Sequence, residues 1–188
     1  MPLAEQKRVY TYRDYLNWDG DKRIEILDGR LYMQAAPSRR HQEILSELHR
    51  QIANYLVGKN CKVYPAPFEV RLETIEISEQ IINVFEPDLS IICDKNKLDD
   101  RGCKGAPDWI IEITSPSTAR VDKIKKFNKY EEAGVKEYWI IEPEENIVSV
   151  FTLGDNKRYG RPEMYAGDEK VIVKTLESLE IDLETVFS

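Results

Sequence analysis

The alternation of apolar and polar residues divides the chain into strand-like and helix-like segments. Two short apolar runs, 23–27 and 30–34, flank Asp28-Gly29. Such a pair is typical of a tight β-hairpin turn, because glycine tolerates a positive φ. Ser38 then stands where it can cap a helix. An apolar stripe at helical spacing follows, with Gly58 near the expected end: Ile44, Leu45, Leu48, Ile52 and Leu56.

Three apolar runs after this helix predict strands at 63–72, 83–93 and 108–114. A second amphipathic helix over 120–133, with Gly134 as its C-cap, leads to strands at 137–141 and 148–151. The tail predicts a further strand and a short terminal helix near Leu183. This order predicts a single α/β or α+β domain over residues 1–188, with a mixed sheet flanked by helices at 40–57 and 120–133.

Composition narrows the class of protein. A chain of 188 residues, 41% of them hydrophobic, can bury the core of one domain. The net charge of −7 argues against non-specific coating of nucleic acid, but it permits a local basic patch beside acidic metal ligands. No run of about 18 apolar residues predicts a transmembrane helix, and the first residues lack the apolar stretch of a signal peptide. We therefore expect a cytoplasmic protein without membrane contact.

Cysteine and histidine are sparse. The three cysteines are widely spaced, no Cys-x-x-Cys occurs, and there are two histidines. This pattern argues against a disulfide framework or a structural zinc site. We expect Cys61, Cys93 and Cys103 to be reduced, with Cys93 on a strand in the core.

Two carboxylates are the strongest candidates for chemistry. Glu112 interrupts the apolar run at 109–113, where a carboxylate is costly to bury without a partner. Asp88 follows Pro87 at the start of the preceding strand. If the two strands are antiparallel neighbours, Asp88 and Glu112 lie together and favour a bound cation such as Mg²⁺. The alternative for Glu112 is a partly exposed strand position or a local pair with lysine.

The segments beside these carboxylates have two interpretations. The turn at 114–118 could offer hydroxyls and N–H groups to a phosphate, or it could be a capped loop between strand and helix. The basic helix could contact a nucleic acid backbone through Arg120, Lys123 and Tyr130, or it could be a solvated face with an Asp122–Lys126 pair. The start of the first helix favours anions and carries Arg39, Arg40 and His41, although a lone histidine is often structural.

Several of these motifs together resemble a known family. They are the hairpin at 25–29, the Pro37-Ser38…His41 step, Pro87-Asp88, the runs at 105–118 and 134–143, and Asp122 with Lys126 and Tyr130. This combination resembles the Uma-type bacterial family of restriction endonucleases, a branch of the PD-(D/E)XK nuclease superfamily. The resemblance covers nearly the whole chain.

The resemblance implies a restriction-endonuclease-like fold and a set of site residues. Asp88 and Glu112 correspond to the acidic pair, and the Ile113 carbonyl would complete the ligands for Mg²⁺ or Mn²⁺. The superfamily's Glu-x-Lys lysine is replaced by Thr114, and the family's lysine would come from the following helix as Lys126. Glu25 on the hairpin resembles a further acidic residue of the site.

The implied activity is metal-dependent hydrolysis of DNA phosphodiester bonds. Two other classes stay open: a nuclease fold without activity that binds DNA or a protein partner, and an enzyme acting on RNA. We also expect a homodimer, because a duplex has two strands to cut and because Tyr138, Trp139 and the run at 148–151 offer much apolar surface.

Overall fold

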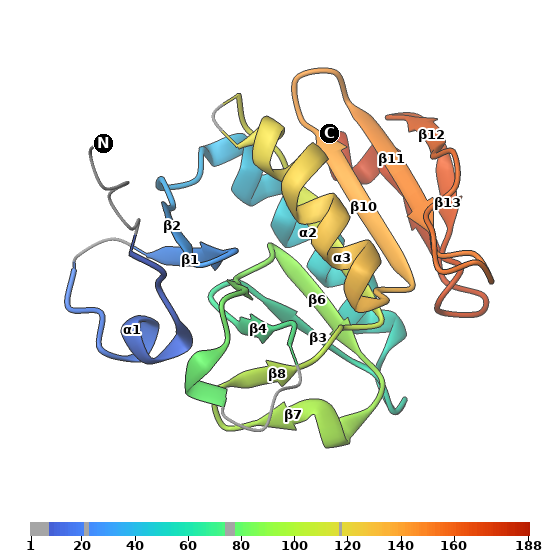
Figure 1. The fold of residues 1–188 in the computed structure, drawn as a ribbon. Helices are drawn as coiled ribbons and strands as arrows, with labels where there is room; N and C mark the ends of the chain where they lie inside the picture. Colours follow the sequence, from blue (N-terminus) through green and yellow to red (C-terminus); the bar gives the residue numbers. More distant parts are fainter. Residues whose placement is uncertain (1–7, 21–22, 74–77, 117) are drawn as a thin grey trace.

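The computed structural model describes residues 8–20, 23–73, 78–116 and 118–188. The N-terminal hairpin belongs to a first six-stranded sheet of mixed direction (Figure 1). Asp28 and Gly29 both have positive φ at its turn, as the Asp-Gly pair predicted. The strands of this sheet lie in the order β2-β1-β5-β4-β8-β7 and have these bounds: β1 Ile24–Leu27, β2 Arg30–Met33, β4 Glu69–Arg71, β5 Val84–Phe85, β7 Leu98–Asp99 and β8 Gly102–Lys104.

A second six-stranded sheet, called here the central sheet, carries most of the core. Its order is β12-β11-β10-β9-β6-β3, with β9 and β10 parallel and the other neighbours antiparallel. A small hairpin of β13 and β14 follows it near the C-terminus. The bounds are β3 Lys62–Pro65, β6 Leu89–Ile92, β9 Trp109–Ile113, β10 Glu137–Glu142, β11 Ile147–Thr152, β12 Glu163–Ala166, β13 Lys170–Ile172 and β14 Glu180–Asp182.

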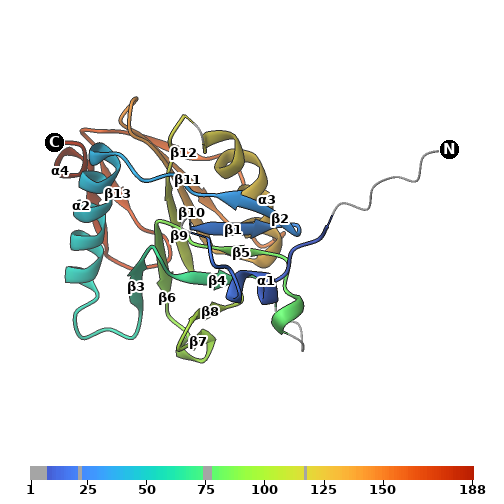
Figure 2. The same cartoon turned by 90° about the vertical axis from the view of Figure 1, so that its left-hand side faces the viewer.

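Helices cover both faces of the central sheet. The long helix α2 packs its stripe of Ile44, Leu48 and Ile52 on one face, together with α4 and the tail. The helix α3 packs on the other face through Phe127 and Tyr130. Figure 2 shows α2 and α4 on one side of the sheet and α3 on the other. The helices are α1 Tyr12–Leu16, α2 Arg39–Tyr55, α3 Phe127–Ala133 and α4 Leu183–Phe187, with a π-helix at Val121–Lys126 and 3₁₀ turns at Ser78–Gln80 and Lys95–Lys97.

These helices match their sequence signals. Ser38 caps α2, with its Oγ accepting from the His41 backbone N–H at 3.1 Å, and Gly134 ends α3 in the left-handed conformation. The expected terminal helix is α4. The fold class is confirmed as mixed α+β with helix-flanked sheets and an N-terminal hairpin. None of the described helices is long and apolar enough to cross a membrane.

The single sheet expected from the sequence is wrong in one respect, because the strands divide between two sheets. The run at 63–72 supplies β3 to the central sheet and β4 to the first sheet, and the run at 83–93 supplies β5 and β6 in the same way. Prolines lie at each division, at Pro65, Pro67 and Pro87. Proline has no N–H to continue a ladder, so each run breaks and changes sheet there.

The expectation of three reduced cysteines is also wrong. Cys61 and Cys93 form a disulfide, and Cys103 is free and buried. The register of the antiparallel β3–β6 pair explains the bond. Lys62 lies opposite Ile92, so the next residues outward, Cys61 and Cys93, face each other across the strand ends. Cys93 is partly buried against the core just beyond β6.

The apolar surface that suggested a homodimer is in the core instead. Tyr138, Trp139 and Val148 have no exposed surface, and Val150 is 2% exposed. They pack on both faces of the central sheet. The homodimer stays a prediction that rests on the need to cut two strands.

Candidate active site

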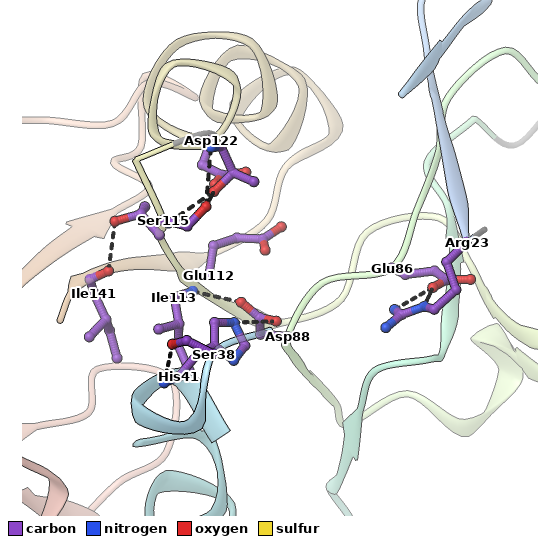
Figure 3. Close-up of polar contacts among 12 residues, drawn as sticks. Arg23, Ser38, His41, Glu86, Asp88, Glu112, Ile113, Ser115, Asp122 and Ile141 are labelled. Atoms are coloured by element: carbon purple, nitrogen blue, oxygen red, sulfur yellow. Dashed lines mark hydrogen bonds and ion pairs between the residues drawn. The ribbon is translucent and has the colours of Figure 1, made fainter. Parts of the chain in front are cut away.

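The antiparallel pairing of β6 and β9 brings the two expected carboxylates together. Leu89 lies opposite Ile111, so Asp88 at the start of β6 is beside Glu112 and Ile113 near the end of β9. The Ile113 backbone N–H donates to Asp88 Oδ2 at 2.7 Å (Figure 3). The sequence prediction that these strands are neighbours in one sheet is confirmed.

Lys126 reaches the same place from the π-helix. Its Nζ lies 2.9 Å from Glu25, 3.0 Å from Glu112 Oε1 and 3.5 Å from Asp122 Oδ1. All four side chains are only 5–6% exposed. A π-helix is wider than an α-helix and occurs often at functional sites. The helix that follows β9 thus places Lys126 beside Glu112, at the position that the family resemblance implied for the lysine of the site.

Burial and crowding set the protonation of this cluster. Burial raises the pKa of Glu112 well above its usual value, and Asp122, Asp88 and Glu25 add to the rise against the opposing charge of Lys126. The pKa of Asp122 is raised for the same first reason. Burial alone would lower the pKa of Lys126, but Glu112, Glu25 and Asp122 outweigh it, and the pKa lies well above its usual value. The site therefore holds one charged lysine ammonium and more carboxyl groups than that single positive charge can neutralise.

The structure gives Tyr130 a role other than the one predicted. Its side chain is fully buried, and its hydroxyl donates to Glu112 Oε1 at 2.8 Å. The ring packs edge-on against Phe85 and Tyr138. A direct contact with nucleic acid is excluded by this burial, so that prediction is wrong. Tyr130 instead holds the carboxylate of Glu112 in place.

His41 lies against Asp88. Its Nε2 is 3.1 Å from Asp88 Oδ1, and its side chain is 13% exposed. Nδ1 is buried and has no hydrogen-bond partner among the described residues. Asp88 is thus held from two sides, by the start of α2 and by the backbone of β9. The predicted contact of His41 with nucleic acid stays a prediction.

These side chains line one cavity of about 420 Å³. Asp88, Glu112, Lys126, Glu25 and His41 all contribute to its wall. The turn after β9 also lines the cavity. It has the hydrogen bonding expected of a capped loop between strand and helix, because the Ser115 N–H donates to Thr118 Oγ1 at 3.1 Å. Ser117 of that turn lies outside the described residues. Thr114, at the position of the superfamily lysine, donates its hydroxyl to the Ile141 carbonyl at 3.1 Å.

The arginines and the lysine predicted to contact nucleic acid, Arg39, Arg40, Arg120 and Lys123, do not line this cavity. Arg39 is 87% exposed and pairs with Glu43 at 2.7 Å. Arg40 donates to the Phe187 carbonyl at 2.6 Å and so fastens α2 to the C-terminus. Lys123 pairs with Glu142, and Arg120 is exposed. Their roles in binding stay predictions.

Sequence reasoning assigned no site role to Asp122, Glu86 or Arg23, which also line the cavity. Asp122 had been weighed as a local pair with Lys126. That pair exists, but it is buried inside the site and adds a third carboxylate around Lys126. The i, i+4 spacing on an otherwise apolar helix face was the available signal.

The donor set fits a hard divalent cation. Asp88, Glu112 and the Ile113 carbonyl offer the oxygen ligands that Mg²⁺ or Mn²⁺ prefers. Within the described ranges, no three Cys, His, Asp or Glu side chains form a ready metal-binding group. Mg²⁺ is usually held by one or two carboxylates plus waters and substrate oxygens, so it does not require such a group. Lys126 and Tyr130 both use Oε1 of Glu112, which leaves Oε2 as the oxygen for a ligand.

Comparison with known proteins identifies the family. Residues 12–184 match the model of Uma2, which is described as "Putative restriction endonuclease". The chain belongs to the Uma2 family. The family resemblance inferred from the motifs at 87–143 is confirmed by this match, which covers most of the chain.

Comparison with individual proteins shows which fold the chain resembles. A crystal structure described as a putative nuclease belonging to DUF820, from Anabaena variabilis ATCC 29413, has a TM-score of 0.74 and 20% identity, over 94% of this chain and 97% of that one. The uncharacterized protein slr1290 of Synechocystis sp. (strain ATCC 27184 / PCC 6803 / Kazusa) is 27% identical over 119 residues. That match spans 62% of this chain and 60% of the relative. The Uma2 chain thus has a nuclease-like fold.

Proposed function

We propose that this Uma2 protein is a metal-dependent endonuclease that hydrolyses DNA phosphodiester bonds. One observation carries the proposal: Asp88, Glu112 and Lys126 come from separate elements and converge on one cavity. Two carboxylates with a lysine beside them suit phosphodiester hydrolysis, in which charge develops on the transferring phosphate. The Uma2 match supports a nuclease, and the choice of DNA and of the metal is our own inference.

Each side chain has a role that follows from its contacts. Asp88, Glu112 and the Ile113 carbonyl would hold Mg²⁺ or Mn²⁺, which lowers the pKa of a bound water and polarises the phosphate. His41 and the Ile113 N–H fix the orientation of Asp88, and Tyr130 fixes that of Glu112.

Lys126 would offset the negative charge that builds on the phosphate oxygens. Glu25 supports it, because Glu25 Oε1 also accepts the Glu86 backbone N–H at 2.8 Å and so anchors the lysine to the first sheet. Since three neighbouring carboxylates outweigh the effect of burial and keep its ammonium charged, Lys126 acts as a fixed positive charge rather than as a base in this state.

The test is cleavage of supercoiled plasmid DNA by the purified protein with Mg²⁺ or Mn²⁺, and with neither. We expect the protein to give nicked or linear products only when metal is present, and we expect Asp88→Asn to give no such products. A matched control is Asp100→Asn, since Asp100 is exposed and does not line the cavity. Metal-independent products, or equal cleavage by both variants, would contradict the proposal.

A second candidate is a nuclease-fold protein that binds DNA or a protein partner without cutting. One observation favours it: both oxygens of Asp88 are already engaged, by His41 and by Ile113. DNA binding that persists in Asp88→Asn, with no cleavage by the unaltered protein under any metal, would identify this function. Single-stranded and duplex RNA in the same assay would show whether RNA is the substrate.

A further inference from the structure

The cavity wall contains one arginine among the described residues, and it was not among the predicted contacts. Arg23 precedes β1, on the same side of the strand as Glu25, which is two residues further on. Its side chain is 41% exposed. Lys126, the lysine of the same wall, is 5% exposed and surrounded by three carboxylates. Arg23 is therefore the cation of this cavity that a phosphate can reach from solvent.

The guanidinium of Arg23 is held at one edge. Its Nε donates to Glu86 Oε2 at 2.6 Å, and its Nη2 contacts the same oxygen. Glu86 is 7% exposed and also accepts the Tyr15 hydroxyl at 2.6 Å. Nη1 makes no hydrogen bond to any residue that the structure describes. An arginine guanidinium carries five N–H donors in one plane. Glu86 fixes the orientation of the Arg23 guanidinium through Nε and Nη2, and the donors of Nη1 are left for a phosphate.

The Arg23–Glu86 pair lies near the carboxylate of Asp88. Glu86 and Asp88 are two residues apart, so their Cα atoms lie at most about 7 Å apart. Figure 3 shows the Arg23–Glu86 pair on the other side of Asp88 from the Ser115 turn. Arg23 and Asp88 line the same cavity. A nucleic acid strand that enters this cavity with one phosphate at Asp88 therefore also meets Arg23 in the same wall.

We propose that Arg23 binds the substrate phosphate next to the one that is cut. Such a contact suits the cavity, because four carboxylates, those of Glu25, Asp88, Glu112 and Asp122, line it. Negative charge there repels a phosphodiester, and Lys126 is the only lysine of the wall among the described residues. Arginine suits the task, because its fork matches two phosphate oxygens at once. This inference rests on the proposed function, since it takes the substrate to be a nucleic acid strand that enters the cavity.

The test separates binding from cleavage. Binding of a fluorescent single-stranded and a duplex DNA oligonucleotide is measured with Ca²⁺ present, as a function of salt. We expect Arg23→Ala to weaken binding about tenfold or more and to lower the salt slope by about one charge. Arg23→Lys should recover part of the loss. Arg50→Ala is the control, because Arg50 is an exposed arginine paired with Glu47 outside the cavity wall, and it should change binding less than about twofold.

Glu86→Gln distinguishes phosphate binding from a structural role. If Arg23 matters only as a partner of Glu86, both variants lose binding equally, and the proposal fails. If Arg23 binds phosphate, Glu86→Gln removes a negative charge and should bind DNA at least as well as the unaltered protein. Circular dichroism during heating of both variants confirms that they are folded in the assay.

The remaining outcomes separate the two proposals. Binding that depends on Arg23, with no cleavage under Mg²⁺ or Mn²⁺, would overturn the nuclease function and leave the phosphate contact standing. If the unaltered protein cleaves DNA with metal but Arg23→Ala binds DNA as tightly as the unaltered protein, the phosphate contact is overturned and the nuclease function stands. An unaltered protein that binds neither oligonucleotide would overturn the assignment of Arg23.

Discussion

Two sets of ion pairs in this protein differ in what they do. On the exposed side of α2, Arg39 pairs with Glu43 and Arg50 with Glu47, one cation to one anion. In the cavity, Lys126 lies within 3.5 Å of three carboxylates that are almost completely buried. Pairs of the first kind occur on most helices and contribute little to stability. A buried excess of negative charge is costly, so a fold that keeps it does so for binding or chemistry.

Among the changes that test this difference between the two sets of ion pairs, replacing Lys126 should have the largest effect on stability and cleavage. Lys126→Met keeps the length of the side chain but leaves Glu25, Glu112 and Asp122 buried without a cation. We expect the free energy of unfolding to fall by about 3–5 kcal/mol in metal-free buffer at neutral pH, as for other buried pairs that lose one partner. Urea denaturation measures this loss, and plasmid cleavage should slow about 100-fold or more.

The neighbouring Lys125→Met is the control for this substitution. Lys125 donates to the Tyr32 hydroxyl at 2.5 Å and is half-buried. Its loss should cost less than about 1 kcal/mol. If Lys126→Met is no less stable than Lys125→Met, the buried cluster is not the strained arrangement described here.

Ionisation of Glu112 should make the free energy of unfolding depend on pH. Its pKa is raised in the folded state, first by burial, from an ordinary value of 4.5. The folded protein therefore binds a proton more tightly than the unfolded chain, and stability should fall as the pH rises above about 4.5 toward the raised pKa, by up to about 1.4 kcal/mol for each pH unit crossed. Urea denaturation at a series of pH values, without metal, measures the slope.

Glu112→Gln should remove most of this slope and abolish metal-dependent cleavage while the protein stays folded. Mg²⁺ should flatten the slope in the unaltered protein, since a cation takes the place of the proton. The same pH dependence in Glu112→Gln as in the unaltered protein would show that another group causes it.

The hydroxyl of Tyr130 should have an intermediate effect. Tyr130→Phe keeps the ring that packs on Phe85 but removes the donor to Glu112 Oε1. We expect a loss of about 1–2 kcal/mol in the free energy of unfolding and slower cleavage, because Glu112 is less firmly oriented. Tyr165→Phe is the control: its hydroxyl donates to exposed Glu163 at 2.7 Å, outside the cavity. Equal effects of the two changes would argue against a positioning role for Tyr130.

Local patterns and family motifs predicted the acidic pair of this site, because Asp88 and Glu112 stand in apolar strands where a carboxylate is conspicuous. Lys126 came from the family resemblance alone. The role of Tyr130 could not be read from its helix, since its burial depends on packing against β5 and β10. Nothing in the sequence distinguishes Arg23 beyond its place at the start of the hairpin. Its role depends on its contact with Glu86, which is 63 residues away and follows β5.

The errors about the fold have the same origin. A pattern of apolar residues shows that a segment is a strand, but it does not show which sheet receives the strand. The runs at 63–72 and 83–93 each enter two sheets. The Cys61–Cys93 bond follows from the register of β3 against β6, a contact between segments 32 residues apart. Spacing of cysteines along the chain could not reveal it.

The smallest effect is expected from the exposed pair on α2. Arg39 lies in the first turn of the helix, where the helix dipole disfavours a positive charge, and its pair with Glu43 has the less favourable order, with the cation N-terminal to the anion. We therefore expect Arg39→Ala to change the free energy of unfolding by less than about 0.5 kcal/mol, with either sign. Chemical denaturation at low and high salt measures it. A loss as large as that of Tyr130→Phe would mean that exposed pairs on α2 stabilise the fold as much as contacts in the cavity do, and the contrast between the two sets of ion pairs would then fail.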